Sequence, residues 1–337
     1  CRASPATAAV IEPGAMKLLL RLASALVLAA LVIAGVLTAI GALYQPNTQI
    51  PTGFLGQHVT VNGLPLRVYQ LGKGQDVLMI HGSPGSVEDW SPMFGALSTR
   101  LRLTAYDRPG HGFSGDSGAY SPSANAAVAE ALMDKLDLQN VIVVGHSYGG
   151  ATALALAALR KPARVSAYVI LDSATYVPLR TIPPLFKPLA IPYLGLGGAS
   201  VLSAFLAPST VRKQLKHVWK DAPEDFIALR TQLWAAPKVS HAMAVETVDA
   251  AASLAAQSPR YPEIQAPVAI LSQADDSRRR STAERLHREL AHSTLELLAG
   301  TGHYVQFEKA EEVCAAIRRL ARLDEREERE DNNDNAP

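Results

Sequence analysis

The chain has 337 residues and a mass of 35.9 kDa, and it is 48% hydrophobic and 19% charged. These proportions allow a large apolar core and exclude a mainly disordered or fibrous chain. Lys and Arg number 32 and Asp and Glu number 31, so the net charge of +1 excludes the basic footprint typical of a nucleic-acid binder.

The two ends of the chain differ in composition from its middle. Residues 1–15 show no periodic pattern and are followed by Met16, which resembles a natural start, so we interpret them as a non-native or disordered leader. Residues 324–337 carry seven acidic residues and two arginines and no apolar residue before Ala336. This composition predicts a disordered acidic tail.

A long uncharged segment follows the leader. Residues 22–43 contain no charge, and as a helix these 22 residues would span about 33 Å, enough for a ~30 Å hydrocarbon core. Lys17 and Arg21 precede the segment, which puts the N-terminus on the cytoplasmic side. We therefore predict that residues 16–44 form a single-pass signal anchor in the lipid bilayer, with the remaining chain on the extracytoplasmic side. The alternative is a signal peptide cleaved near residues 39–41, which would release a secreted protein.

The middle of the chain alternates between short apolar runs and helical patterns. Two extended runs within residues 57–72 are separated by Asn62-Gly63, which predicts a β-hairpin. Six short, continuous apolar runs then suit strands that are buried on both faces of a parallel sheet. These runs are residues 77–80, 101–105, 141–144, 168–171, 268–271 and 295–298. Together with the helical stretches between them, they predict a doubly wound α/β fold.

One stretch interrupts the alternation. Residues 173–262 contain no clear strand and are too long for a loop in a compact domain. We interpret them as a helical lid inserted between two parts of one core, residues 45–172 and 263–323. The first third of this stretch carries only two charges, Arg180 and Lys187. It predicts an apolar lid that faces a lipophilic pocket or the membrane, or, alternatively, one that simply packs on the core.

A candidate nucleophile follows the third of the six apolar runs. Residues 145–149 read Gly-His-Ser-Tyr-Gly, the G-x-S-x-G pattern, directly after a β-branched run and before an Ala-rich helix. A serine on such a tight turn projects its Oγ above the sheet, and the helix N-terminus favours developing negative charge. We therefore predict that Ser147 is a catalytic nucleophile.

A serine nucleophile needs a base and an acid that orients the base. His303 follows the last predicted strand and should reach the same edge of the sheet as Ser147. The chain order Ser, Asp, His points to the end of the penultimate strand for the acid, where Asp275 and Asp276 are neighbours. Asp172, after the strand that follows Ser147, is a third candidate.

The oxyanion of an acyl-transfer intermediate needs two backbone donors. The N–H of Tyr148, directly after the nucleophile, supplies one. The loop His81-Gly82-Ser83-Pro84-Gly85 leaves an apolar strand and brings the Ser83 N–H toward the same point. Neither a metal-ligand spacing nor a cofactor motif is present, and the two cysteines are too few for a Cys-rich zinc site, so we expect no cofactor and no metal.

Four ordered motifs give residues 57–321 a resemblance to the α/β-hydrolase superfamily. They are HGSPG at 81–85, DRPGHGFS at 107–114, GHSYGG at 145–150 and GTGHYVQFE at 300–308. The resemblance implies an eight-stranded, mostly parallel sheet flanked by helices, with a lid after strand six. It also implies Ser147 as nucleophile, His303 as base, and Ser83 and Tyr148 as oxyanion donors. The superfamily's usual acid motif matches at Asp276, although Gln273 replaces its glycine.

We expect a membrane-anchored, lid-bearing serine hydrolase that cleaves a small, lipophilic carboxylic ester through an acyl-enzyme. Relatives that act on epoxides or haloalkanes use aspartate at the nucleophile position, so Ser147 argues against both activities. The alternatives are a carbon–carbon bond hydrolase or lactonase that uses the same triad, or a non-catalytic ligand-binding protein of this fold. The sequence does not specify the substrate or the oligomeric state.

Overall fold

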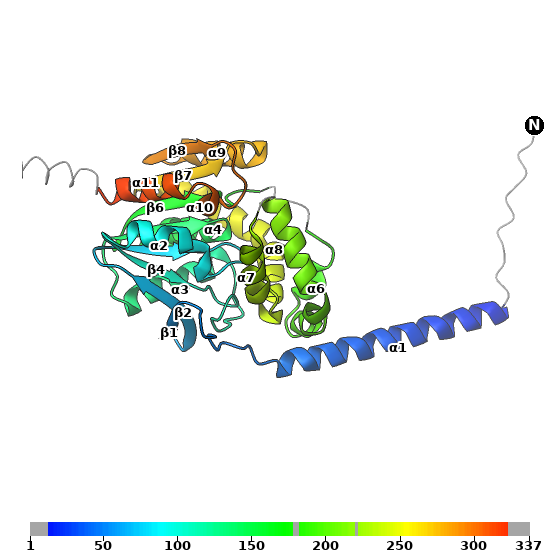
Figure 1. Ribbon diagram of the computed structural model, residues 1–337. Coiled ribbons are helices and arrows are strands. Elements are labelled where there is room, and N and C mark those ends of the chain that lie inside the picture. Colours follow the sequence, from blue (N-terminus) through cyan, green and yellow to red (C-terminus); the bar gives the residue numbers. More distant parts are fainter. Residues whose placement is uncertain (1–12, 178–181, 220–221, 323–337) are drawn as a thin grey trace, which may run out of the picture.

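A computed structural model describes residues 13–177, 182–219 and 222–322. The predicted acidic tail, residues 324–337, lies outside the described residues, and so do residues 1–12 of the predicted leader. The described chain forms a sheet flanked by helices, a group of further helices beside one edge of this core, and a long N-terminal helix that projects away from it (Figure 1).

The sheet has eight strands in the order β1-β2-β4-β3-β5-β6-β7-β8. Only β2 runs antiparallel to its neighbours, and all other pairs are parallel, as the sequence predicts. Asn62 and Gly63 both have positive φ in the hairpin between β1 and β2. The strands are β1 (Gln57–Val61), β2 (Leu64–Leu71), β3 (Gln75–Ile80), β4 (Leu101–Tyr106), β5 (Val141–His146), β6 (Val165–Leu171), β7 (Val268–Gln273) and β8 (Ser293–Leu298).

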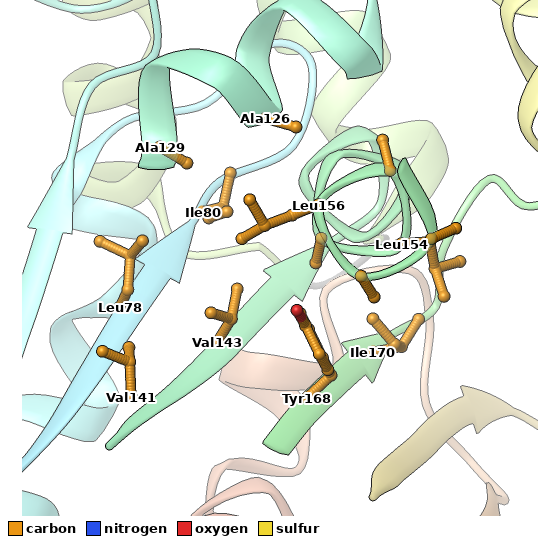
Figure 2. Packing of buried hydrophobic residues seen from close by; sticks show 14 of the residues in the cluster. Leu78, Ile80, Ala126, Ala129, Val141, Val143, Leu154, Leu156, Tyr168 and Ile170 are labelled. Atoms are coloured by element: carbon orange, nitrogen blue, oxygen red, sulfur yellow. The ribbon is translucent and has the colours of Figure 1, made fainter. Parts of the chain in front are cut away.

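Helices cover both faces of the sheet because the central strands are apolar on both sides. Leu78 of β3 and Val143 of β5 pack toward one set of helices (Figure 2), and Met79 and Val144 pack toward the other. The first set is α3 (Pro122–Lys135), α4 (Tyr148–Ala155) with the π-helical turn Leu156–Arg160, and α9 (Ser277–Glu289). The second set is the 3-10 turn Val87–Trp90, α2 (Ser91–Leu97), α10 (Val305–Glu308) and α11 (Ala310–Leu320).

A helical insert, which we define as the described residues between β6 and β7, lies where the sequence predicts a lid. It contains α5 (Phe186–Leu189), α6 (Leu194–Val218), α7 (Glu224–Trp234), α8 (Pro237–Gln257) and the 3-10 helix Ser258–Glu263. The helix α6 is bent by 89° between residues 194–203 and 208–216, and Pro208 lies inside it. Proline removes a backbone donor and clashes with the preceding turn, which accounts for a bend at this place.

The N-terminal helix α1 (Pro13–Leu43) is long and apolar enough to cross a membrane by length and composition. Its side chains are almost entirely exposed, except near its C-terminal end, where it meets α6. A Cβ built on Gly41 would lie 1.8 Å from the carbonyl oxygen of Tyr193, and one built on Gly197 would lie 1.8 Å from that of Leu37. The two backbones therefore touch, and both glycines are required for this approach.

Candidate active site

Ser147 occupies the turn between β5 and α4, with φ of 54° and ψ of −115°. This strained conformation is held by the surrounding structure, including a 2.9 Å hydrogen bond from Ser147 N to the carbonyl of Leu171. The turn has no space for side chains on either flank. A Cβ on Gly145 would lie 2.4 Å from the Gly149 carbonyl oxygen, and one on Gly149 would lie 2.0 Å from that of Ile80. The spacing of the two glycines is therefore a steric requirement of the turn.

His303 lies in the segment between β8 and α10 and contacts Ser147, as the sequence predicts. Its Nε2 lies 3.0 Å from Ser147 Oγ, and its Nδ1 lies 2.5 Å from Asp172 Oδ2. An ionised carboxylate can only accept hydrogen bonds, so Nδ1 donates a hydrogen bond to Asp172 and Nε2 is left to accept the serine proton. The three side chains form a continuous hydrogen-bonded relay across the carboxyl ends of β5, β6 and β8.

The preference for Asp276 as the carboxylate partner of His303 is wrong in this structure. Asp276 is the N-cap of α9, where its Oδ1 accepts hydrogen bonds from the backbone N–H groups of Arg278 and Arg279 at 2.9 and 3.0 Å. The neighbouring Asp275 accepts a 2.9 Å bond from Gly300 N instead. The helix α9 begins at Ser277 and uses Asp276 as its cap.

Asp172, the third candidate, lies directly after β6 and is buried. Besides His303, its carboxylate accepts bonds from Ser272 Oγ at 2.9 Å and Gln273 Nε2 at 2.8 Å, and Arg279 Nε lies 3.7 Å away. Burial by itself would raise the pKa of Asp172, but the His303 hydrogen bond and the Arg279 charge hold this pKa below its ordinary value. Asp172 is therefore ionised at neutral pH. Gln273, which replaces the expected glycine, is one of its donors.

His146 packs beneath the catalytic histidine candidate, with ring centroids 4.7 Å apart. Its Nε2 donates a 2.9 Å hydrogen bond to the His303 backbone carbonyl, which fixes the segment that carries the imidazole. Burial, followed by the nearby His303, lowers the pKa of His146 to about 3. His146 is thus a neutral structural support at physiological pH.

The loop that follows β3 passes directly beside the nucleophile. A Cβ built on Gly82 would lie 3.1 Å from Ser147 Cβ, so Ser83, the next residue, is close to the reacting side chain. Arg108 holds this loop through bonds from Nη2 to the Gly82 carbonyl at 2.8 Å and from Nε to the His81 carbonyl at 3.0 Å. The guanidinium also lies over the Tyr148 ring, 5.1 Å from its centroid.

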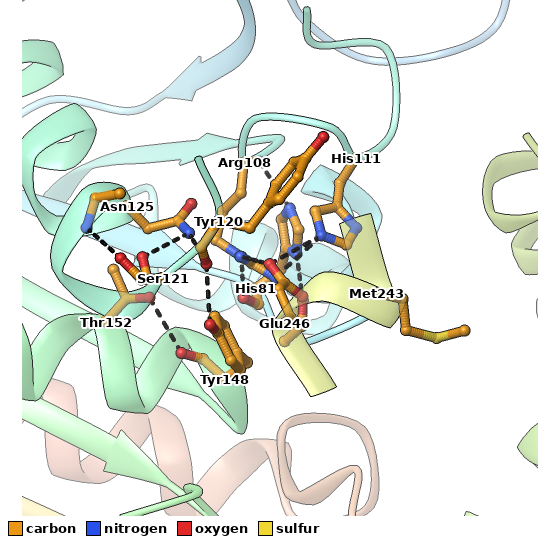
Figure 3. Close-up of polar contacts among 12 residues, drawn as sticks. His81, Arg108, His111, Tyr120, Ser121, Asn125, Tyr148, Thr152, Met243 and Glu246 are labelled. Atoms are coloured by element: carbon orange, nitrogen blue, oxygen red, sulfur yellow. Dashed lines mark hydrogen bonds and ion pairs between the residues drawn. The ribbon is translucent and has the colours of Figure 1, made fainter. Parts of the chain in front are cut away.

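Glu246, on α8 of the insert, forms a buried ion pair with Arg108 and lies 3.2 Å from His111 Nε2 (Figure 3). Burial would raise the pKa of Glu246, but Arg108 and His111 lower this pKa to about 2. Burial is the largest effect on His111 and holds the pKa of its imidazole below the ordinary value, although the charge of Glu246 opposes this shift. The pair connects the helical insert to the loop that carries Ser83. Sequence reasoning missed it, although Arg108 lies within the DRPGHGFS motif.

Within the three described ranges, no group of three or more His, Cys, Asp or Glu side chains is placed to hold a metal ion. The contacts among Ser147, His303 and Asp172 support the chemistry of an activated serine hydroxyl.

Comparison with known proteins finds matches to both the sequence and the fold of this chain. Residues 77–316 match the family model described as "Alpha/beta hydrolase family". A 2-hydroxy-6-oxo-2,4-heptadienoate hydrolase of Pseudomonas putida is 32% identical over 124 residues, covering 35% of this chain and 45% of the relative. A pimeloyl-[acyl-carrier protein] methyl ester esterase of Nitrosospira multiformis is 34% identical over 113 residues, covering 33% and 42%. The matches thus span less than half of either relative.

Among solved structures, the enol-lactonase of Burkholderia xenovorans LB400 superimposes with a TM-score of 0.59 and 20% sequence identity. The superposition covers 79% of this chain and 99% of the lactonase. At this identity the likeness establishes the shared fold alone.

Proposed function

This chain belongs to the alpha/beta hydrolase family, and we propose that it is a serine hydrolase that cleaves carboxylic esters with Ser147, His303 and Asp172. The observation that carries the proposal is the relay from Asp172 through His303 to Ser147 Oγ, with contacts of 2.5 and 3.0 Å. Asp172 replaces the sequence-preferred Asp276 in the role of the acid.

The reaction follows from this arrangement. His303 Nε2 takes the Ser147 proton as Oγ bonds to the ester carbonyl carbon, and the ionised Asp172 stabilises the resulting imidazolium. The backbone N–H groups of Ser83 and Tyr148 bind the oxyanion of the tetrahedral intermediate. His303 then gives its proton to the departing alkoxide, which leaves an acyl group on Ser147. Water, deprotonated by His303, attacks the acyl-enzyme and releases the acid.

The same proposal includes attachment to a membrane through α1 and a lipophilic ester as substrate. Support comes from the backbone contact between α1 and α6 at Gly41 and Gly197, because cleavage of α1 would leave Gly197 and its neighbours without their packing partner. The helical insert acts as the lid. It packs beside His303, since Tyr304 belongs to the same apolar cluster as residues of α6 and α7.

The test is labelling of the full chain, in detergent, with a fluorophosphonate, followed by a panel of esters of increasing acyl length. We expect labelling of the parent chain, its loss in Ser147→Ala and turnover of esters. A folded parent that neither labels nor turns over any ester would overturn the proposal and favour a binding protein. Turnover of vinylogous diketones in place of esters would instead indicate a carbon–carbon bond hydrolase.

A further inference from the structure

Exposed apolar side chains outside α1 are concentrated in one part of the molecule. Among the described residues after α1, nine large hydrophobic side chains are more than a third exposed, and seven of them lie between residues 177 and 206. Phe205, at 80% exposed, is the extreme case. The seven are Val177, Leu185, Ile191, Tyr193, Val201, Phe205 and Leu206. A soluble surface rarely gathers so many large apolar groups, and such a patch marks an interaction site.

The helix α6, which carries part of this patch, meets α1 at the end from which the chain enters the globular domain (Figure 1). The first half of α6 touches α1 at Leu37 and Gly41, both inside the uncharged segment 22–43. At 1.5 Å per residue, this contact lies roughly 3 to 9 Å inside the C-terminal end of that segment. If α1 crosses a bilayer, the first half of α6 must then lie at the depth of the headgroup and acyl boundary.

We infer that α5 and the first half of α6, residues 186–206, dock into the same membrane leaflet that receives the C-terminal end of α1. The inference rests on the proposed membrane attachment. The partner that covers this surface is lipid, because residues 186–206 adjoin the apolar surface of α1 and carry a single charge, Lys187. An amphipathic or apolar helix in this position buries its apolar face about 5–10 Å into the interface, in agreement with the depth set by the contact.

The helix geometry fits this placement. Glycine-to-backbone contact, as at Gly41 and Gly197, is the packing that brings helices together in lipid. The 89° bend of α6 directs its second half, residues 208–216, away from the first half. This second half carries Arg212, Lys213 and Lys216, which suit water or lipid headgroups and not the acyl region.

The docked surface is also connected to the loop after β3, which carries Gly82 and Ser83. The Leu189 carbonyl, at the end of α5, accepts a 2.7 Å hydrogen bond from His241 Nδ1 on α8. One and a half turns further along α8, Glu246 pairs with Arg108, which binds the Gly82 carbonyl. A substrate dissolved in the bilayer would therefore meet the insert at α5 and α6. These helices are connected through α8 to the loop that carries Ser83.

Environment-sensitive fluorescence tests the inference directly. The full chain carrying Cys1→Ser and Cys314→Ala is given a single cysteine by Phe205→Cys, labelled with the fluorophore NBD and reconstituted in phosphatidylcholine vesicles. The matched control is Glu311→Cys, an exposed position on α11. We expect the label at 205 to shift to the blue, to be quenched by doxyl-labelled lipids and to be protected from iodide, and the label at 311 to show the opposite pattern.

Equal iodide quenching at the two positions in vesicles would overturn docking. So would a blue shift at 205 that needs no lipid and grows with protein concentration, since a second copy would then cover the patch. Neither result depends on activity.

Turnover separates docking from the proposed function. The double variant Val201→Ser and Phe205→Ser should lose roughly tenfold in kcat/KM on a vesicle-embedded ester, from lost apolar burial, while kcat/KM on a short water-soluble ester stays at the parental value. Equal loss on both esters would contradict docking. If the parent hydrolyses no ester, the proposed function fails and the fluorescence result still decides docking.

Discussion

His303 Nδ1 lies 2.5 Å from the carboxylate of Asp172, which directly follows β6, and is not bonded to Asp276, which follows β7. The carboxylate partner of His303 therefore follows the strand adjacent to β5, and Ser147 directly follows β5. Two aspartates that follow neighbouring strands thus have different structural roles. One is buried and orients the imidazole, and the other starts a helix.

Asp172→Asn should lower kcat by about 10³- to 10⁴-fold, because an amide neither stabilises the imidazolium nor selects the correct tautomer of His303. The measurement is steady-state ester turnover together with the rate of fluorophosphonate labelling. Asp276→Asn is the matched control and should leave both near the parental values, since asparagine caps a helix about as well as aspartate. A large loss in Asp276→Asn with parental turnover in Asp172→Asn would restore the sequence-based preference.

Gln273→Ala should lower kcat by roughly tenfold, since a hydrogen bond to a charged group contributes about 1.5–3 kcal/mol. The 2.8 Å bond from Gln273 Nε2 helps to hold the pKa of Asp172 below its ordinary value, so the loss should grow as the pH is lowered. A pH–rate profile measures both effects. Gln265→Ala, at an exposed position, serves as the control. A uniform loss with no change in the pH profile would indicate a role in packing alone.

The sequence was sufficient to predict the sheet and the contact between Ser147 and His303. Six of the strands contain one of the short apolar runs, and Ser147 and His303 are placed by their positions after strands, which depend on local pattern. Which aspartate bonds to His303 depends on which of the two strand ends lies closer to this histidine, and on where α9 begins. Both are tertiary properties. The glycine missing at position 273 was the only local sign that the usual acid position had changed.

The contact between Arg108 and Glu246 was not predictable in the same way. The two residues are 138 positions apart, and Glu246 lies in an apparently ordinary amphipathic helix of the insert. Nothing in the local pattern distinguishes it from a solvent-exposed glutamate. Only the packing of α8 on the loop after β3 buries it.

Glu246→Gln should change how stability depends on pH. The folded-state pKa of Glu246, about 2, is below its ordinary value of 4.5, so its contribution is fully present above pH 4.5 and is lost as the pH falls toward 2. The shift corresponds to roughly 3 kcal/mol at neutral pH, to order of magnitude. Unfolding midpoints from pH 3 to 7 measure it. We expect a lower midpoint at pH 7 and a flatter acid limb in the variant, whereas parallel curves for variant and parent would contradict the assignment.

Gly149→Ala should destabilise the fold by several kcal/mol or prevent folding, because its Cβ would lie 2.0 Å from the Ile80 carbonyl and the end of β3 would have to move. Gly95→Ala is the matched control. A Cβ there meets nothing within 4 Å, and alanine in the middle of α2 should stabilise by up to ~1 kcal/mol. Thermal unfolding of the full chain in detergent compares the two. Similar midpoints for both variants would show that the turn at Ser147 relaxes more easily than its geometry indicates.

Gly41→Ala should separate α1 from the helical insert, because its Cβ would lie 1.8 Å from the backbone oxygen of Tyr193, which a side-chain rearrangement cannot relieve. Gly35→Ala, on the same helix with nothing within 4 Å of the added methyl, should have no such effect. Limited proteolysis of vesicle-reconstituted protein measures the difference, and we expect faster cleavage within the insert for Gly41→Ala alone. Equal cleavage rates in the two variants and the parent would mean that the insert holds its position without α1. The contact would then no longer support retention of α1 as an anchor.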